Sequence, residues 1–353
     1  MTVNCESYYR ETVQESLQET ERFVEEMRKK NYSTVQPIIT PRFAVTCDMP
    51  LMTGLAEMAR KYDLPIQTHL SENLDEIATV KGMNPTCRSY TEIYERAGLL
   101  TNKTLLAHGI HLDDEELDVI RKHGASIIHC PSSNCFLQSG VCDTIRLLDK
   151  NVNIGLGTDM GAGYSPSILE IMRRSVDVSS VLTNCRRDFG LSKNSSGPYS
   201  NQSSSQHSNH SSSQHSNHSS GPHSKGPLPN STLDSPSKSA KPLNFERAFY
   251  LATMGGAKAL NLDGHIGNFA CGKRFDALVI NMDVPDSPLD FYQELTLQEK
   301  FLKFFFTGDD RNIQRVYVDG KLIRDKTDTL PNGHTMTQTR RGRTGVTVKG
   351  RHL

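Results

Sequence analysis

Residues 64–77 read LPIQTHLSENLDEI, a short apolar run that stops at a histidine and turns into a helical pattern. A β-favouring run that leads directly into a helix is typical of the strand-to-helix junction of a βα unit. At such a junction the strand presents His69 at its carboxyl end, and the turn beyond it presents Glu72. The stretch therefore predicts a parallel sheet with polar side chains along one edge.

The same pattern recurs along the chain. Four further apolar runs end in polar or ionisable residues: VQPIITPRF (35–43), TLLAHGIHL (104–112), ASIIHCPSSN (125–134) and VNIGLGTD (152–159). Amphipathic stretches with helical spacing separate them, among them residues 51–62, 74–80 and 115–123. The spacing suits βα units, which take about 30 residues each. We therefore expect an α/β fold of the (β/α)₈ TIM-like barrel type.

Polar residues at the ends of these runs are expected to converge, because the carboxyl ends of barrel strands surround one mouth. The residues are Arg42, His69, Glu72, His108, His129 and Asp159. A single strand-end histidine is usually a hydrogen-bonded structural residue, and an aspartate after Gly-Thr is usually a turn or cap residue. Their recurrence in phase with the barrel repeat favours a functional site.

The chemistry of this set indicates a metal-dependent hydrolase. Neutral imidazole and carboxylate groups bind zinc or a similar divalent ion, which lowers the pKa of a bound water toward about 7. We expect His69 to supply a ligand nitrogen, and Asp159 a ligand oxygen that also accepts the proton of the water. Glu72 lies beyond the strand end, where a carboxyl group can exchange protons with the substrate. His108 is either a further ligand or a group that polarises the reacting centre.

Composition narrows the class of protein. The chain has 353 residues, of which 36% are hydrophobic, enough for one enzyme-sized domain with an appendage. Lys plus Arg and Asp plus Glu both total 40, so the charge does not indicate nucleic acid or a membrane as partner. No secretory signal or membrane-spanning run is visible, and the eight cysteines form no CxxC pair. These features predict a cytoplasmic protein with reduced thiols.

One internal segment departs from the barrel pattern. Residues 192–242 are dominated by Ser, Asn, Gln, His, Gly and Pro, and they contain the octamer SSSQHSNH twice. Such a composition buries too little apolar surface to offset the entropy of ordering, so we expect a disordered insertion. The residues from 326 to 353 are rich in Thr, Arg and Gly, and we expect a disordered basic tail there.

Five segments together closely resemble the guanine deaminase family of the amidohydrolase superfamily. They are PRFAVTC (41–47), QTHLSENLDEI (67–77), LLAHGIHL (105–112), ASIIHCPSSN (125–134) and IGLGTDMGAGYSPSILEIMRRS (154–175). Two later stretches, LDGHIGNFACGKRFDALVIN (262–281) and GDDRNIQRVYVDGKLI (308–323), are similar to the small β domain of that family. The resemblance covers nearly all of the chain except the insertion and the tail.

The resemblance implies hydrolysis of guanine to xanthine and ammonia, a step of purine catabolism, at one zinc ion per subunit of a homodimer. His69 and Asp159 match zinc ligands, and Glu72 matches the proton shuttle. His108 matches the histidine that orients the attacking hydroxide or the tetrahedral intermediate. Arg42 and Phe43 match the pair that recognises guanine, with the guanidinium donating to the carbonyl oxygen. We therefore expect the substrate to contact Arg42, Phe43, His69, Glu72 and Asp159.

The chain departs from the family pattern in one respect. Two further zinc ligands of that family come from a His-X-His pair on the first barrel strand, and this chain has no such pair outside the insertion. We therefore expect a truncated form of a functional enzyme, with an impaired zinc site, whose barrel lacks its first strands. The alternatives are an inactive deaminase-like protein that acts by association, or a related aminohydrolase or chlorohydrolase for another heterocycle.

The resemblance also implies a domain organisation. We expect a partial barrel over 1–191, the insertion over 192–242, a barrel-closing helix over 243–262, part of a small β-sandwich domain with a final helix over 263–325, and the tail over 326–353.

Overall fold

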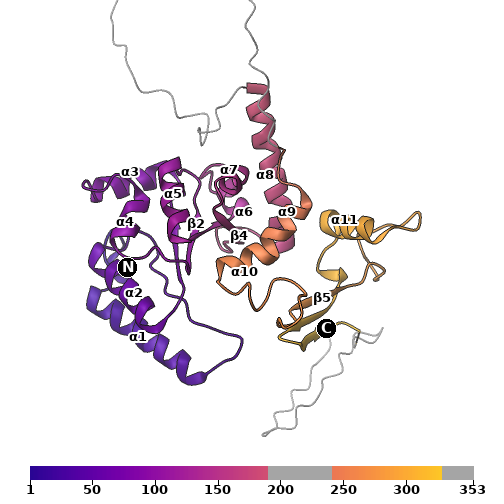
Figure 1. Cartoon of the computed structure of the whole chain (residues 1–353), viewed down its shortest axis with the longest axis horizontal. Helices are drawn as coiled ribbons and strands as arrows, with labels where there is room; N and C mark the ends of the chain where they lie inside the picture. The colour runs from indigo at the N-terminus through magenta and orange to yellow at the C-terminus, as the bar shows by residue number, and fades with distance from the viewer. Residues whose placement is uncertain (190–240, 328–353) are drawn as a thin grey trace, which may run out of the picture. The chain divides into compact units, whose positions relative to one another are not determined.

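The computed structural model describes residues 1–189 and 241–327 (Figure 1). One compact unit runs from Met1 to Asn268, and a second begins at Phe269. Each unit has its own sheet, of four strands in the first unit and three in the second. The expected insertion and tail lie outside the described residues, apart from their short ends at 241–242 and 326–327.

The sheet of the first unit is parallel, and its strands follow one another in chain order. They are β1 (Ile66–Leu70), β2 (Thr104–His108), β3 (Ser126–His129) and β4 (Asn153–Leu156). Leu70 lies opposite His108, and His129 lies opposite Leu156. Since a crossover connects each strand to the next, all four carboxyl ends meet at one edge of the sheet. This edge is where the sequence predicts polar residues to converge.

Helices connect the strands and follow the last of them. They are α3 (Leu74–Met83), α4 (Tyr90–Arg96), α5 (Asp114–His123), α6 (Pro131–Phe136), α7 (Thr144–Asp149) and α8 (Ile168–Phe189). Capping boxes start α3 at Asn73 and α5 at Asp113, in each case with a glutamate at the third helical position. The predicted helices at 74–80 and 115–123 are confirmed. Helices α4, α6 and α7 are too short for periodicity to reveal them.

The run at 35–43 was expected to be a strand, and this expectation is wrong. Only Ile39 pairs with the sheet, through an isolated parallel bridge to Ile66. Pro37 and Pro41 flank it, and proline has no N–H to donate to a ladder. The run therefore lies alongside β1 as an irregular segment, which bonds to β1 again where the Arg42 carbonyl accepts from the His69 N–H.

The chain before this segment forms a pair of helices. A short 3₁₀ turn, η1 (Ser7–Tyr9), precedes α1 (Val13–Lys30), and α2 (Met49–Tyr62) follows and packs against α1 (Figure 1). The helix predicted at 51–62 is confirmed by α2. Neither these helices nor the others in the described part of the chain are long and apolar enough to cross a membrane.

After residue 240 the first unit continues as an interrupted helix. It comprises α9 (Phe245–Tyr250), the π-helical turn η2 (Leu251–Gly255) and α10 (Gly256–Ala259). Both η2 and α10 pack against β4 (Figure 1). Gly255 permits this close approach, since a Cβ atom there would collide with the carbonyl oxygen of Ile154.

The second unit contains an antiparallel sheet of β5 (Ala277–Ile280), β6 (Ile313–Val318) and β7 (Lys321–Asp325). Asp319 and Gly320 form a two-residue hairpin between β6 and β7, and both have positive φ, as the tight turn requires. The helix α11 (Leu297–Thr307) and the 3₁₀ turn η3 (Asp310–Asn312) lie between β5 and β6 in the chain.

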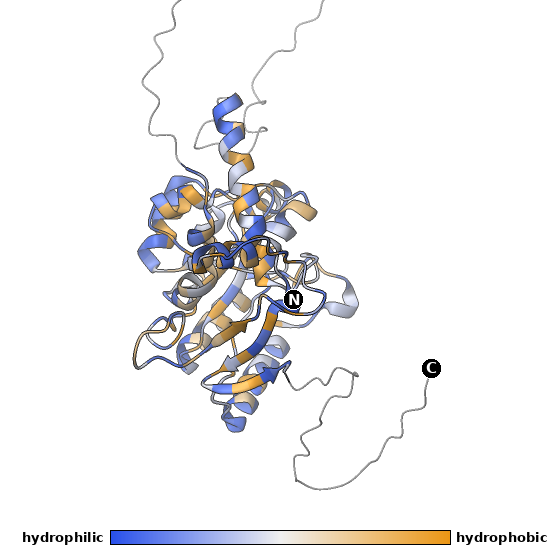
Figure 2. Cartoon of the chain, turned by 90° about the vertical axis from the view of Figure 1, so that its right-hand side faces the viewer, coloured by the Kyte–Doolittle hydropathy of each residue, from blue (hydrophilic) through white to orange (hydrophobic). Residues whose placement is uncertain are grey.

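The core of the first unit is apolar and surrounds its sheet. Ile66, Leu70, Leu106, Ile127 and Ile154 are all at most 1% exposed. Figure 2 shows that the helices carry both hydrophilic and hydrophobic residues, as expected for helices with one buried face. A packed sheet of this kind holds the strand ends rigidly, which is what a precise site requires.

Candidate active site

Three predicted ligand residues meet at the carboxyl edge of the parallel sheet. His69 lies in β1, His108 ends β2, and Asp159 follows β4. Their ligand atoms all lie within 4.8 Å of one another. The imidazole rings of His69 and His108 stack, with centroids 5.2 Å apart and an angle of 18° between their planes. The set therefore offers two nitrogens and one carboxylate oxygen to one point.

The backbone at these strand ends is unusual. Ser71, His108 and Asp159 have φ values of 48°, 72° and 46°, in the left-handed region that residues other than glycine seldom adopt. Such residues often cluster at functional sites, where the surrounding structure imposes the conformation. Beyond Asp159, the N–H of Gly163 donates to the Asp159 carbonyl oxygen at 2.6 Å and closes a tight loop. A Cβ atom at Gly163 would collide with the Thr158 carbonyl oxygen, so this loop requires glycine.

Hydrogen bonds fix the tautomers of both histidines. The Nδ1 atom of His69 lies 2.7 Å from the carbonyl oxygen of Arg42, and a carbonyl can only accept, so Nδ1 carries the proton. The Nδ1 atom of His108 lies 2.9 Å from Oδ1 of Asn134, which accepts in the same way. In the neutral form of both rings Nε2 then carries no proton and is available to a metal ion.

The residues present fit a divalent metal ion. Nε2 of His108 is buried and has no hydrogen-bond partner among the described residues. Buried polar atoms are rarely left unsatisfied, and coordination to a cation would satisfy this one. The donor set of imidazole nitrogen and carboxylate oxygen suits zinc and similar ions.

Glu72 lies beside this group and is held in place on two sides. The Ser139 hydroxyl donates to its Oε1 atom at 2.8 Å, and its Oε2 atom lies 3.6 Å from Nε2 of His108. The backbone N–H of Glu72 donates to the carboxylate of Glu76 at 2.9 Å, which anchors the turn after β1. The Glu72 side chain is 15% exposed, so the carboxylate remains accessible to a small molecule.

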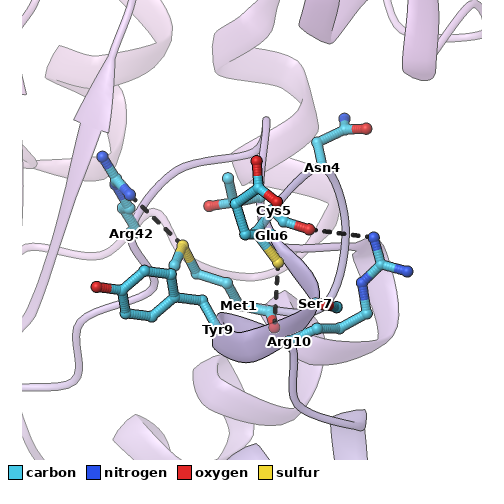
Figure 3. Close-up of a pocket in the computed structure, with 9 residues that line it drawn as sticks. Met1, Asn4, Cys5, Glu6, Ser7, Tyr9, Arg10 and Arg42 are labelled. Atoms are coloured by element: carbon cyan, nitrogen blue, oxygen red, sulfur yellow. Dashed lines mark hydrogen bonds between the residues drawn. The ribbon is translucent and has the colours of Figure 1, made fainter.

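Arg42 and Phe43 lie next to His69 but reach in different directions. The Phe43 ring is 5.9 Å from the His69 ring, and the Arg42 guanidinium lies over the Phe43 ring at 5.1 Å. The Nη1 atom of Arg42 is 3.5 Å from the sulfur of Met1, at the rim of a hollow of about 620 Å³ (Figure 3). The hollow is lined by Met1, Asn4, Cys5, Glu6, Ser7, Tyr9, Arg10, Arg42 and Thr46.

His129 is fully buried behind these residues. It ends β3 with 0% exposure, and neither ring nitrogen has a hydrogen-bond partner among the described residues. Burial, and then the electrostatic interaction with His108, lower the pKa of His129 to about 3, so the ring is neutral at physiological pH. Burial likewise raises the pKa of the neighbouring Cys130 thiol to about 12, which keeps it unreactive.

The burial of His129 predicts a pH-dependent stability. In the unfolded chain its pKa returns to about 6.5, so below that pH the unfolded state binds a proton that the folded state excludes until about pH 3. The stability contribution is therefore intact above about pH 6.5 and is lost progressively as the pH falls toward 3. Between about pH 7.5 and 5, the free energy of unfolding of the metal-free protein should fall by about 2 kcal/mol more than in His129→Gln.

Urea denaturation at the two pH values checks this prediction. The variant His123→Ala serves as a control, because His123 is a partly exposed histidine at the end of α5, paired with Glu95. It should retain most of the wild-type pH dependence. An identical fall in the wild type and His129→Gln would show that His129 does not cause the loss.

The structure thus brings together most of the predicted set. His69, His108 and Asp159 form one group, Glu72 adjoins it, and Phe43 packs near His69. Sequence reasoning missed Ser139, because a serine after a short helix carries no periodic or motif signal and its contact with Glu72 spans 67 residues of chain. Asn134 lies in one of the runs that the sequence singles out, but its bond to His108 is visible only in three dimensions.

Comparison with known proteins identifies the class. Residues 2–195 and 230–323 match the model of the Amidohydrolase family, and the chain belongs to that family. The expected membership of the amidohydrolase superfamily and the expected α/β fold class are thereby confirmed.

Individual relatives narrow the comparison. The chain is 43% identical over 319 residues to guanine deaminase of Homo sapiens and 38% identical over 317 residues to guanine deaminase of Dictyostelium discoideum. These matches cover 89% and 90% of this chain but only 59% of each relative, so the chain spans less than two thirds of their length. A solved guanine deaminase from C. acetobutylicum, with guanine bound in its active site, has 33% identity and a TM-score of 0.71. That match covers 92% of this chain and 64% of the solved chain.

Proposed function

We propose that the protein catalyses the hydrolytic deamination of guanine to xanthine and ammonia. The observation that carries the proposal is the meeting of His69, His108 and Asp159 within 4.8 Å, with the Glu72 carboxylate beside them. The relatives named guanine deaminase, and the related structure with bound guanine, support this choice of reaction and substrate.

We propose zinc as the metal, one ion per subunit, held by His69 and Asp159, with His108 as a further ligand or as the group that orients the reacting centre. When bound, the ion supplies a water whose pKa is lowered toward about 7. The bond from His69 Nδ1 to the Arg42 carbonyl oxygen keeps the ligand nitrogen unprotonated and the ring in one orientation. The Asp159 carboxylate would accept a proton during attack on the ring carbon.

Glu72 is proposed to shuttle protons to the purine. Its carboxylate lies between Ser139 and His108, and this position beside the ligand group supports a role in proton transfer to the ring nitrogen and the leaving amine. The hydroxyl of Ser139 directs one carboxylate oxygen, so the other is free to exchange the proton. The reaction requires a general base and then a general acid at one position. The Glu72 carboxyl group can serve as both, because it alternates between its ionised and its protonated form.

Recognition of guanine is assigned to Arg42 and Phe43. The guanidinium can donate to the carbonyl oxygen at C6, and the aromatic ring can pack near the base. The Phe43 ring, 5.9 Å from the His69 ring and covered by the Arg42 guanidinium at 5.1 Å, supports this assignment. We further propose a cytoplasmic homodimer, which the resemblance and the reduced cysteines support.

Turnover by the natural full-length protein tests the proposal. Guanine consumption, ammonia release and zinc content should be measured together, with a chloro-triazine and adenosine as alternative substrates. Release of ammonia from guanine with bound zinc supports the proposal. Turnover of another heterocycle alone would indicate a different amidohydrolase, and absence of any turnover in a metal-loaded protein would indicate a protein that acts by association.

Removal of the Ser139 hydroxyl is expected to slow catalysis without loss of the metal. Ser139→Ala leaves Oε1 of Glu72 without its donor, so kcat should fall about tenfold while zinc content stays constant. Ser175→Ala is a matched control, since among the described residues its buried hydroxyl bonds within α8, to the Ile171 carbonyl. Equal values of kcat for the two variants would contradict the proposal that Ser139 positions the Glu72 carboxylate.

A further inference from the structure

A buried tyrosine hydroxyl joins the two segments that the proposed function assigns to purine recognition and to metal binding. Tyr94 lies in α4 and is 0% exposed. Its oxygen lies 2.7 Å from the carbonyl oxygen of His69 and 3.2 Å from the backbone nitrogen of Ala44. It also lies 3.1 Å from the Thr68 hydroxyl and 3.2 Å from the Tyr90 hydroxyl.

The donor and acceptor roles follow from chemistry. A phenol has one proton to donate, and the His69 carbonyl can only accept, so that proton belongs to the shortest contact, at 2.7 Å. The N–H of Ala44 can only donate, so the Tyr94 oxygen accepts it. The hydroxyl of Thr68 or of Tyr90 can donate the second hydrogen bond that the Tyr94 oxygen accepts. Burial raises the pKa of Tyr94, so the phenol keeps the proton that this arrangement needs.

These bonds hold the turn at residues 42–44 against β1. We call the set of bonds between residues 42–44 and β1 the joint. At its Arg42 end, the Arg42 carbonyl accepts from His69 Nδ1 at 2.7 Å and lies 3.2 Å from the Thr68 hydroxyl. On the other side, Tyr94 links Ala44 to the His69 carbonyl. Arg42 and Phe43, the proposed recognition pair, are therefore fixed at both ends of a three-residue segment.

Helix α4 is itself anchored, so it can act as a fixed support. The buried Glu116 of α5 accepts from both the N–H and the hydroxyl of Thr91, at 3.2 and 2.9 Å. The Tyr90 hydroxyl lies 3.2 Å from the nitrogen of Ala44 but makes no contact with His69. The two tyrosines thus differ in one respect, since only Tyr94 reaches the metal-ligand strand.

We propose that Tyr94 is a positioning residue that sets the register between the recognition turn at residues 42–44 and the metal ligand His69, and thereby contributes to the selection of 6-oxopurines. The proposal rests on the proposed function for the identity of the substrate. The joint itself rests only on the geometry.

The test compares Tyr94→Phe with the wild-type full-length holoenzyme, using guanine and 2-aminopurine, which lacks the oxygen at C6. The KM for guanine is expected to rise about tenfold, because the backbone that carries Arg42 and Phe43 is held less precisely against β1. The inhibition constant of 2-aminopurine should change less than about threefold. Zinc content should be retained. Tyr90→Phe should show a smaller rise, since Ala44 keeps its bond to Tyr94.

Thr104→Val is the control for loss of a buried hydroxyl. The Thr104 hydroxyl donates to the Leu99 carbonyl at 2.6 Å, at the opposite end of β2, so this variant should lose stability but not selectivity. An equal loss of affinity for both purines in Tyr94→Phe, or a loss of selectivity in Thr104→Val, would overturn the proposal.

Hydrogen exchange separates this proposal from the proposed function. Amide exchange of the peptide over residues 40–47, followed by mass spectrometry without substrate, should be about tenfold faster in Tyr94→Phe and unchanged in Thr104→Val. Unchanged amide exchange in Tyr94→Phe would overturn the claim that Tyr94 fixes residues 42–44 against β1, whatever the activity of the variant. If the wild type fails to convert guanine, the proposed function fails, and the exchange result still decides whether Tyr94 fixes the turn.

Discussion

Replacing Glu72 with glutamine is expected to lower kcat for guanine by at least about a thousandfold, within the range typical of a lost general acid–base group. Glutamine preserves the size of the side chain and can still interact with Ser139, but it cannot carry a proton between water and purine. Because Glu72 is not a predicted metal ligand, zinc content should remain that of the wild type. Steady-state kinetics and metal analysis on the same preparation measure both quantities.

Asp75→Asn is the matched control for this variant. Asp75 is an exposed carboxylate in the first turn of α3, three positions along from Glu72, and undergoes the same change from acid to amide. It should retain the wild-type rate. Substantial turnover by Glu72→Gln would mean that another group transfers the proton.

Replacing His69 with alanine is expected to remove both the metal and the activity. Changes to groups that merely support metal ligands typically cost about 10- to 100-fold in metal affinity, so loss of a ligand should exceed about 100-fold. Asp159 and His108 would remain within reach of the same point but would lack the nitrogen from β1. Zinc content after dialysis against a weak chelator is the measurement, and kcat/KM should fall with it.

His123→Ala controls for loss of a histidine. His123 ends α5, the helix that leads into the start of β3, so it lies toward the opposite edge of the sheet from the ligand group. This variant should keep its metal. Full zinc retention by His69→Ala would contradict the assignment of His69 as a ligand.

Much of the fold follows from local sequence. Alternation of apolar runs with helical periodicity predicted strands in the runs at 65–72, 104–112, 125–134 and 152–159, and the structure has strands there, at 66–70, 104–108, 126–129 and 153–156, in one parallel sheet. The error at 35–43 has a local cause, since Pro37 and Pro41 interrupt the ladder and leave only the bridge at Ile39. The apolar residues of this run favour a strand, but Pro37 and Pro41 lack the N–H donors that a ladder requires.

The candidate site was predictable to the extent that it lies on strand ends. His69, His108 and Asp159 could be placed together because every parallel strand delivers its carboxyl end to the same edge. Ser139 and Tyr94 could not, because each acts through a contact to a distant part of the chain. No pattern within either segment distinguishes such a hydroxyl from an ordinary buried one.

The sequence by itself determined the order of the four parallel strands and their longer helices and the residue types of the candidate ligand set, since both depend on short-range periodicity and on residue type. Only the tertiary structure decided which carbonyl fixes the His69 tautomer, which hydroxyl holds Glu72, and which tyrosine ties the turn at 42–44 to β1. These choices depend on distances between atoms that are far apart in the chain. Packing of the whole unit sets those distances.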